Sequence, residues 1–240
     1  MGQSEVKVLK IDYELGGRKS IHPAILCDDS DRILADCGYP GFLPMLERAS
    51  AAAGVPLGEL TGIVITHHDY DHYGALREIV EKYPHIRAMS SEFDAPYIEG
   101  KKPPLRVSLG KEIFASLSGE MREEARRFRA KLESVKPVKI DRVFRGGEVT
   151  PWCGGTEIIS TPGHMPGHIS LYVRPLKTLI TGDALIALRG KLRTPNPQYA
   201  TDAEEAKKTA AALLAMDVEK FVCYHGGAVT RNGDALVFER

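Results

Sequence analysis

Six of the eight histidines in this chain fall in three short segments, and each segment directly follows a run of residues typical of a β-strand. The first segment, His67–His72, also carries two aspartates. The second is His164–His168, the third is at His225, and a further strand run ends at Asp183. Because strand ends can direct side chains from a rigid sheet into one cleft, this pattern predicts a sheet-based fold with a shared polar site.

These residue types make a donor set for transition-metal ions. Imidazole and carboxylate groups together suit zinc, iron, manganese or cobalt, whereas calcium and magnesium prefer oxygen ligands alone. Alternate residues of an extended segment point the same way, so the first segment can present several ligands on one side. Two ions need about six or seven protein ligands. Seven candidates are present: His67, Asp69, Asp71, His72, His164, Asp183 and His225.

Short apolar runs alternate with helical patterns in both halves of the chain, which predicts an α/β protein. The expected strands are Val6–Tyr13, Ala24–Asp28, Arg32–Cys37, Gly62–Thr66, Arg142–Phe144, Glu157–Ser160, Ser170–Arg174, Thr178–Thr181 and Phe221–Tyr224. The expected helices are Phe42–Ala53, Leu76–Tyr83 and Asp202–Met216, the last opened by a capping box at Thr201. Residues 93–139 are expected to form a helical insertion with one long helix over Lys111–Ser134, either a surface helix or a lid.

Length and composition fit one domain over residues 1–240. Lys+Arg and Asp+Glu balance at 32 each, so no nucleic acid or membrane partner is expected, and a small-molecule substrate is. No signal peptide is apparent at the N-terminus, which predicts a cytoplasmic protein. The four cysteines lack CxxC spacing and are expected to be buried, apolar and unpaired. The oligomeric state stays open.

The four site segments, taken in order, resemble the metallo-β-lactamase superfamily. Thr66–His72 is similar to its HxHxDH signature, and Thr161–His164 is similar to its third-histidine segment. Thr181–Asp183 resembles its bridging-aspartate segment, and Tyr224–Gly226 its last-histidine segment. The resemblance covers almost the whole chain. It implies a four-layer αβ/βα sandwich of the metallo-β-lactamase type with the metal ions at the edge of the sheets.

The resemblance also implies a ligand set. Two divalent metal ions are the implied cofactor, with zinc expected first because it is prevalent in the family, and with iron or manganese as alternatives. Carried over by position, the first ion takes His67, Asp69 and His164, the second takes Asp71, His72 and His225, and Asp183 bridges them.

One position departs from the family pattern. The usual second histidine is Asp69 here, which resembles the glutamate of flavodiiron proteins and favours a harder metal such as iron. His68 lies next to it, but at odd parity its side chain is expected to point away. From the sequence alone, Asp69→His is expected to give a family-like site that retains metal.

The implied activity is that of a dinuclear metallohydrolase, in which a metal-bound hydroxide attacks a small ester, thioester or lactone and Asp71 is the catalytic residue that orients it. The chain ends 15 residues after His225, which argues against the glutathione thioesters of hydroxyacylglutathione hydrolases. The insertion favours a lactonase-like activity. The alternatives are a phosphodiesterase of the same superfamily and a di-iron redox protein.

Three further residues are weaker candidates. His168 and Arg189 are candidates for substrate contact. His168 could instead hydrogen-bond to a metal ligand or be a core residue, and Arg189 could belong to a solvated basic loop. Asp36 follows a strand and is expected to shape a turn near the site.

Overall fold

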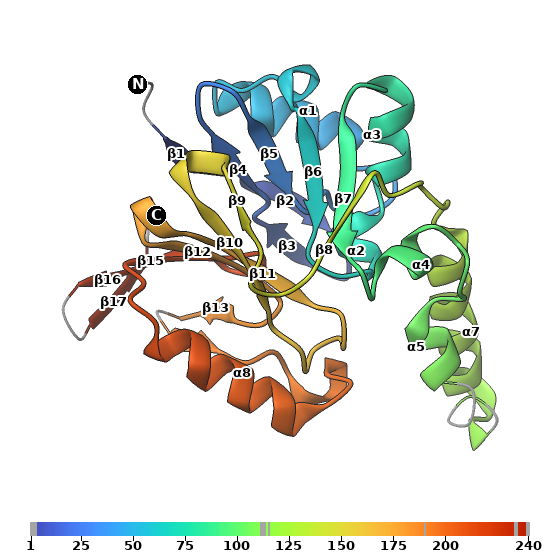
Figure 1. The fold of residues 1–240 in the computed structure, drawn as a ribbon. Coiled ribbons are helices and arrows are strands. Elements are labelled where there is room, and N and C mark those ends of the chain that lie inside the picture. The colour runs from blue at the N-terminus through green and yellow to red at the C-terminus, as the bar shows by residue number, and fades with distance from the viewer. Residues whose placement is uncertain (1–3, 111–113, 115, 190, 233–234, 239–240) are drawn as a thin grey trace.

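Two β-sheets pack face to face in the computed structural model, which describes residues 4–110, 114, 116–189, 191–232 and 235–238 (Figure 1). Within these residues the first sheet has the order β1 (Glu5–Val8), β4 (Ala24–Cys27), β5 (Arg32–Ala35), β6 (Gly62–Ile65), β7 (Arg87–Ser91) and β8 (Arg142–Phe144). β5 to β8 run parallel to one another. Their carboxyl ends therefore meet at one edge of the sheet.

The second sheet has, in the described part of the chain, the order β17 (Ala235–Phe238), β16 (Gly227–Asn232), β15 (Lys220–Cys223), β12 (Thr178–Gly182), β11 (Ile169–Val173), β10 (Thr156–Ser160) and β9 (Val149–Thr150). β12 and β15 are parallel, and helix α8 (Ala203–Ala215) makes the crossover between them. This sheet brings the ends of β12 and β15 to the same edge.

The buried side chains form three core layers, one between the two sheets and one between each sheet and the helices that cover it. In β6, Ile63 and Ile65 face the helices, while Val64 faces the second sheet, as the period of two along a strand requires. Helices α1 (Leu43–Ala52) and α3 (Leu76–Lys82) cover the outer face of the first sheet, and α8 covers the second (Figure 1). The expected four-layer αβ/βα sandwich is confirmed.

The N-terminal strand prediction is wrong. Val6–Tyr13 is two strands in different sheets, because β2 (Ile11–Glu14) forms a separate hairpin with β3 (Arg18–Ile21). Val8 packs against the core between the sheets, whereas Leu9 lies in the core beneath the helices. This alternation is that of an extended chain, so burial alone does not separate the two strands, and the break lies where the pairing partner changes from β4 to β3.

The start of α8 also differs from the expected capping box. The N-cap is Asp202, whose side chain accepts a hydrogen bond from the backbone N–H of Glu205 at 2.9 Å. The hydroxyl of Thr201 instead donates to the carbonyl of Gly163 at 3.1 Å. The helix begins one residue later because Thr201 is used to attach the loop before His164.

The insertion contains α4 (Ala95–Ile98), α5 (Leu105–Leu109) and α7 (Gly119–Ser134), and it extends beside the sandwich (Figure 1). One continuous helix over Lys111–Ser134 is wrong in its described part, because Ser118 is extended and Gly119 has a φ of 56°. Residues 111–113 and 115 lie outside the described residues. No helix in the described ranges is long and apolar enough to cross a membrane.

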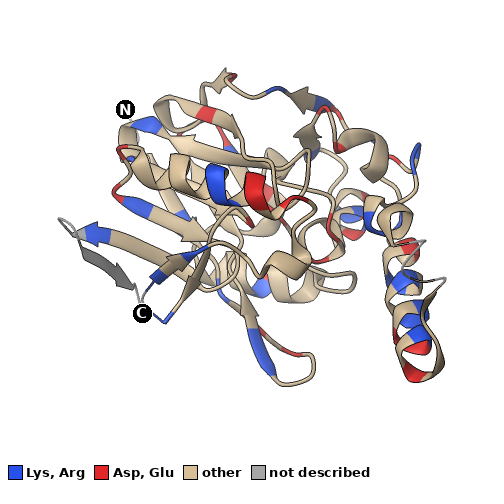
Figure 2. Cartoon of the chain, turned by 90° about the horizontal axis from the view of Figure 1, so that it is seen from below, with Lys and Arg blue, Asp and Glu red and all other residues tan. Residues whose placement is uncertain are grey.

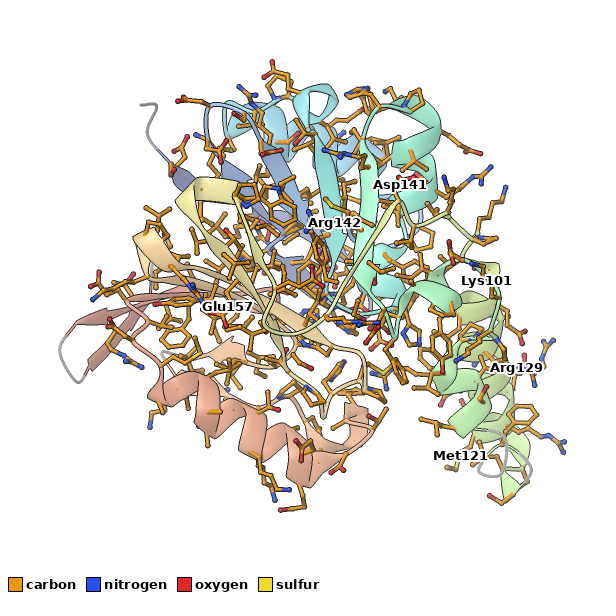
Figure 3. All side chains as sticks on the ribbon, in the orientation of Figure 1. Lys101, Met121, Arg129, Asp141, Arg142 and Glu157 are labelled. Carbon is orange, nitrogen blue, oxygen red and sulfur yellow. The ribbon has the colours of Figure 1, made fainter. Side chains whose placement is uncertain are left out.

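Most of α7 faces solvent. Acidic and basic residues both occur along it (Figure 2), with ion pairs such as Arg126–Glu123 and Arg129–Glu133. Arg129 projects away from the sandwich (Figure 3). Met121 is 64% exposed, whereas Leu132 is buried. The four cysteines, all within the described chain, are free and buried, as expected.

Candidate metal centre

All seven predicted ligands lie at the shared edge of the two sheets. His67 and Asp69 follow β6, and the short helix α2 (Tyr70–Tyr73) carries the next two candidates. The remaining three lie on loops of the second sheet. Among the described residues, three groups have ligand atoms within 4.8 Å of one another: His67, Asp69 and His164; His67, His72 and Asp183; Asp71, His72 and His225.

The first group centres on the carboxylate of Asp69. Its Oδ2 atom lies 3.3 Å from Nε2 of His67 and 3.1 Å from Nε2 of His164. Oδ2 of Asp183 approaches the same His164 nitrogen at 3.5 Å. Two imidazoles and two carboxylates thus surround one position.

The group of Asp71, His72 and His225 lies beside the other oxygen of Asp183. Its Oδ1 atom lies 3.4 Å from Nε2 of His72 and 3.5 Å from Nε2 of His225. Oδ2 of Asp71 lies 3.4 Å from the same His225 nitrogen. Asp183 therefore presents one oxygen to each group.

Several atoms of the cluster have no protein partner. Nε2 of His67, Nε2 of His72 and Oδ1 of Asp183 are buried without a hydrogen bond to any described residue. Buried polar atoms are rarely left without a partner, and these converge with other imidazole and carboxylate donors. The donor set fits divalent transition-metal ions, which would take up these atoms.

Electrostatics within the protein also favour a cation here. Burial opposes protonation of His72, but the carboxylates of Asp183, Asp36 and Asp71 raise its pKa well above the usual value. The buried carboxylate of Asp69 has a pKa held well below its usual range, because His164, His67 and Arg106 outweigh the effect of burial. The cluster is a concentration of negative charge that attracts positive charge.

The second sheet fixes its ligands through loop contacts. The carbonyl of His164 accepts from the N–H of Thr201 at 3.0 Å, so this ligand is attached to the start of α8. The carbonyl of His225 accepts from the N–H of Ala187 at 2.9 Å. Gly226 follows with a φ of 107°, and a Cβ there would lie 1.9 Å from the carbonyl oxygen of Ala187. Glycine is therefore required for this close approach.

Asp36 orients His72. Its Oδ2 atom accepts from Nδ1 of His72 at 2.9 Å, while the N–H and hydroxyl of Thr66 donate to the same carboxylate. With the proton on Nδ1, the Nε2 lone pair of His72 faces the cluster. Asp36 was expected only to shape a turn, and its backbone has a φ of 61°. Its hydrogen bond to a ligand is an additional role.

Asp36→Asn is therefore expected to weaken metal binding. The amide can still accept from Thr66, but its NH₂ group would face Nδ1 of His72 and favour the tautomer with the proton on Nε2. Loss of such a contact typically costs about 10–100-fold in affinity. Competition with a chromogenic chelator measures this change, and Asp12→Asn, at a half-exposed carboxylate paired with Arg18, is the control. Equal affinities for Asp36→Asn and the wild type would contradict the role.

His168 supports Asp183. Its Nε2 atom accepts from the backbone N–H of Asp183 at 2.9 Å, and Nδ1 lies 2.7 Å from the hydroxyl of Thr161. Burial and the nearby His164 lower the pKa of His168 to about 3, so the ring is neutral. Both ring nitrogens are used inside the protein, which leaves neither for the substrate contact that the sequence suggested.

Two other candidates lie away from the cluster. Arg189 is exposed in the turn between β13 (Ile186–Leu188) and β14 (Lys191–Arg193), and it makes no hydrogen bond or ion pair with any described ligand. His68 forms a short contact with Asp94 and stacks on Tyr97 at a centroid distance of 4.3 Å. Its ring therefore takes no part in the three ligand groups.

Arg106 is the residue at this site that the sequence did not indicate. It lies on α5 of the insertion and donates from Nε and Nη2 to the two oxygens of Asp69, each at 2.5 Å. The insertion carries other arginines that form exposed ion pairs, such as Arg126 and Arg129. Nothing in the local sequence distinguishes Arg106 from them.

Comparisons with known proteins give consistent matches. The family model described as the metallo-beta-lactamase superfamily matches residues 17–225. The probable metallo-hydrolase YflN of Bacillus subtilis is 27% identical over 216 residues, which cover 82% of this chain and 76% of that protein. A hydroxyacylglutathione hydrolase of Synechococcus is 27% identical over 144 residues, 60% of this chain and 40% of that protein.

A solved structure has the same fold. A metallo-beta-lactamase family protein of Thermus thermophilus superposes with a TM-score of 0.72 at 21% identity, covering 94% of this chain and 74% of that one.

Proposed function

The chain belongs to the metallo-β-lactamase superfamily, and we propose that it is a hydrolase that uses two divalent metal ions to cleave a small ester, thioester or lactone. One observation carries this proposal. Asp183 presents Oδ2 to His164 and Oδ1 to His72 and His225, which suits a carboxylate shared by two cations. Relatives described as probable metallo-hydrolases support the general class of reaction.

The ligands would divide as the geometry groups them. His67, Asp69 and His164 would hold one ion, and Asp71, His72 and His225 would hold the other, with Asp183 between them. Ions held by these residues would supply a water whose pKa is lowered from 15.7 to about 7 and would polarise a substrate carbonyl. Zinc is the metal proposed first. A carboxylate at position 69 favours binding of iron or manganese more than an imidazole there would.

Asp71 is the proposed catalytic residue. Its side chain is 18% exposed, so it is the most accessible of the three carboxylates, and Oδ2 lies 3.4 Å from His225. The backbone carbonyl of Asp71 accepts from the hydroxyl of Tyr224 at 2.6 Å, which fixes the start of α2. A carboxylate held there can accept a proton from the attacking water and keep it aimed at the substrate.

A carbonyl substrate is proposed on two grounds. A hydroxyacylglutathione hydrolase, whose name denotes thioester cleavage, is among the relatives of this chain. The insertion also approaches the site through Arg106, as a wall over a small substrate would. The match to the hydrolase covers 40% of that protein, so the thioester is proposed as a class of bond and not as a glutathione derivative.

The native protein is expected to hold close to two transition-metal ions per chain. Elemental analysis after purification without chelators measures the number and the identity of the ions. A panel of ester, thioester, lactone and phosphodiester substrates, assayed before and after chelation, then tests the reaction. Trace metal only would overturn the proposal, and turnover confined to phosphodiesters would overturn the substrate class.

A further inference from the structure

We propose that Arg106 and Asp69 act as one charge-compensated unit at the first metal position, with Arg106 as the positioning residue for the Asp69 ligand. This inference rests on the proposed function and specifies how its least usual ligand works. It concerns Asp69, the one position of the signature at which this chain has a carboxylate in place of the usual histidine. Its consequence is that Asp69 cannot be replaced by histidine unless Arg106 is replaced as well.

Two hydrogen bonds from Arg106 hold the carboxylate of Asp69, one at each oxygen. Nε of Arg106 donates to Oδ1 and Nη2 donates to Oδ2, so the planar guanidinium and the carboxylate form a parallel pair. Both partners are largely buried, with side-chain exposures of 19% for Arg106 and 9% for Asp69. A pair of this kind restrains rotation of the carboxylate and keeps Oδ2 directed at His67 and His164.

The Nη2 atom of Arg106 has three contacts at the site. This nitrogen carries two N–H groups, and it has acceptors in Oδ2 of Asp69 and in the backbone carbonyl of Tyr199 at 3.0 Å. Nη2 also lies within hydrogen-bond distance of Nε2 of His164, at 3.1 Å. The guanidinium therefore lies directly beside two of the candidate ligands, Asp69 and His164.

Charge explains why the two residues belong together. The cluster contains the carboxylates of Asp69, Asp71 and Asp183, and the guanidinium of Arg106 balances one of them. A neutral imidazole at position 69 would leave the guanidinium buried, unpaired and a few ångströms from a divalent cation. Both an unpaired buried charge and repulsion between like charges at that distance are costly. This reverses the expectation, drawn from the sequence alone, that Asp69→His retains metal.

The same guanidinium also joins the insertion to the core of the site. α5 lies in the insertion, Asp69 follows a strand of the first sheet, and Tyr199 ends a short turn (Pro197–Tyr199) before α8. One side chain therefore contacts segments separated by 37 and by 93 positions in the sequence. Arg106 therefore links α5 to the charge at the first metal position.

The test compares Asp69→His with the double variant Asp69→His/Arg106→Leu. Metal equivalents are counted and dissociation constants for zinc are measured by chelator competition, with circular dichroism of the metal-free proteins as the check on folding. Asp69→His alone is expected to bind the weaker ion at least about tenfold less tightly than the wild type. The double variant is expected to recover most of that loss.

Arg129 provides the matched control, because it lies in the same insertion, is half exposed and pairs with Glu133. Asp69→His/Arg129→Leu should bind zinc like Asp69→His. If histidine at position 69 prevents folding, Asp69→Asn with and without Arg106→Leu gives the same comparison. A merely structural Arg106 would make the double variant worse than the single one.

Failure of the proposed function and failure of the Arg106–Asp69 pairing give different results in these measurements. A wild-type protein that binds no more than trace zinc, iron or manganese overturns the proposed function. A wild-type protein with two ions, together with Asp69→His that binds both as tightly, overturns the pairing of Arg106 and Asp69 and leaves the proposed function standing.

Discussion

Asp183→Asn is expected to lower kcat/KM on the best carbonyl substrate by at least about 100-fold, which corresponds to roughly 2.7 kcal/mol in the barrier. The carboxylate of Asp183 offers one oxygen to each ligand group, and the amide would replace one of those oxygens with an NH₂ group that cannot bind a cation. The negative charge that partly neutralises two adjacent cations would be lost as well.

The fold is expected to survive this change, because His168 holds the backbone N–H of Asp183 and not its side chain. Asp217→Asn is the control, since that carboxylate is exposed and pairs with Lys177. Steady-state kinetics and circular dichroism are measured on both variants. If Asp183→Asn stays within about tenfold of the wild type, a change of less than roughly 1.4 kcal/mol, the carboxylate does not bridge two ions.

The parts of the fold that follow from local patterns could be predicted from the sequence. β6 is short, apolar and followed by polar residues, and its expected range of Gly62–Thr66 differs by one residue from Gly62–Ile65. The separation of β1 and β2 could not be predicted, because Val6–Tyr13 has apolar residues on both faces and only the strand pairing in the fold shows where the chain changes sheets. A helical period likewise continued through Ser118, where the backbone is extended.

The candidate site likewise contains residues that could be predicted from the sequence and residues that could not. The convergence of the seven candidate ligands was predictable because the sheet itself brings strand ends together, and each of the seven belongs to one of the three groups. Arg106 could not be predicted, because its partner Asp69 lies 37 positions away in the sequence. Only the folded insertion places α5 beside Asp69. The hydrogen bond from His72 to Asp36 spans 36 positions and is equally invisible in a local pattern. Asp36 and Arg106, which hydrogen-bond to candidate ligands, belong to no sequence motif, whereas the candidate ligands themselves do.

Asp69→Ala is expected to reduce the metal content from two ions per chain to one. The first position would keep only His67, His164 and the shared Asp183, and the guanidinium of Arg106 would be left unpaired beside His164. A buried cation without a partner opposes the binding of another cation. Elemental analysis of the purified variant, and of the same variant after addition of zinc and gel filtration, measures the number of ions retained.

His68→Ala is the decisive companion, because it tests the neighbouring position in the same loop. Its ring contacts Asp94 and Tyr97 instead of the cluster, so the metal content should stay at that of the wild type. The variant should still be less stable by about 1–3 kcal/mol, because the buried Asp94 loses a hydrogen-bond partner, and denaturant unfolding measures this loss. If His68→Ala releases an ion while Asp69→Ala keeps two, the loop after β6 presents the other residue to the metal, and the ligand assignment is wrong by one position.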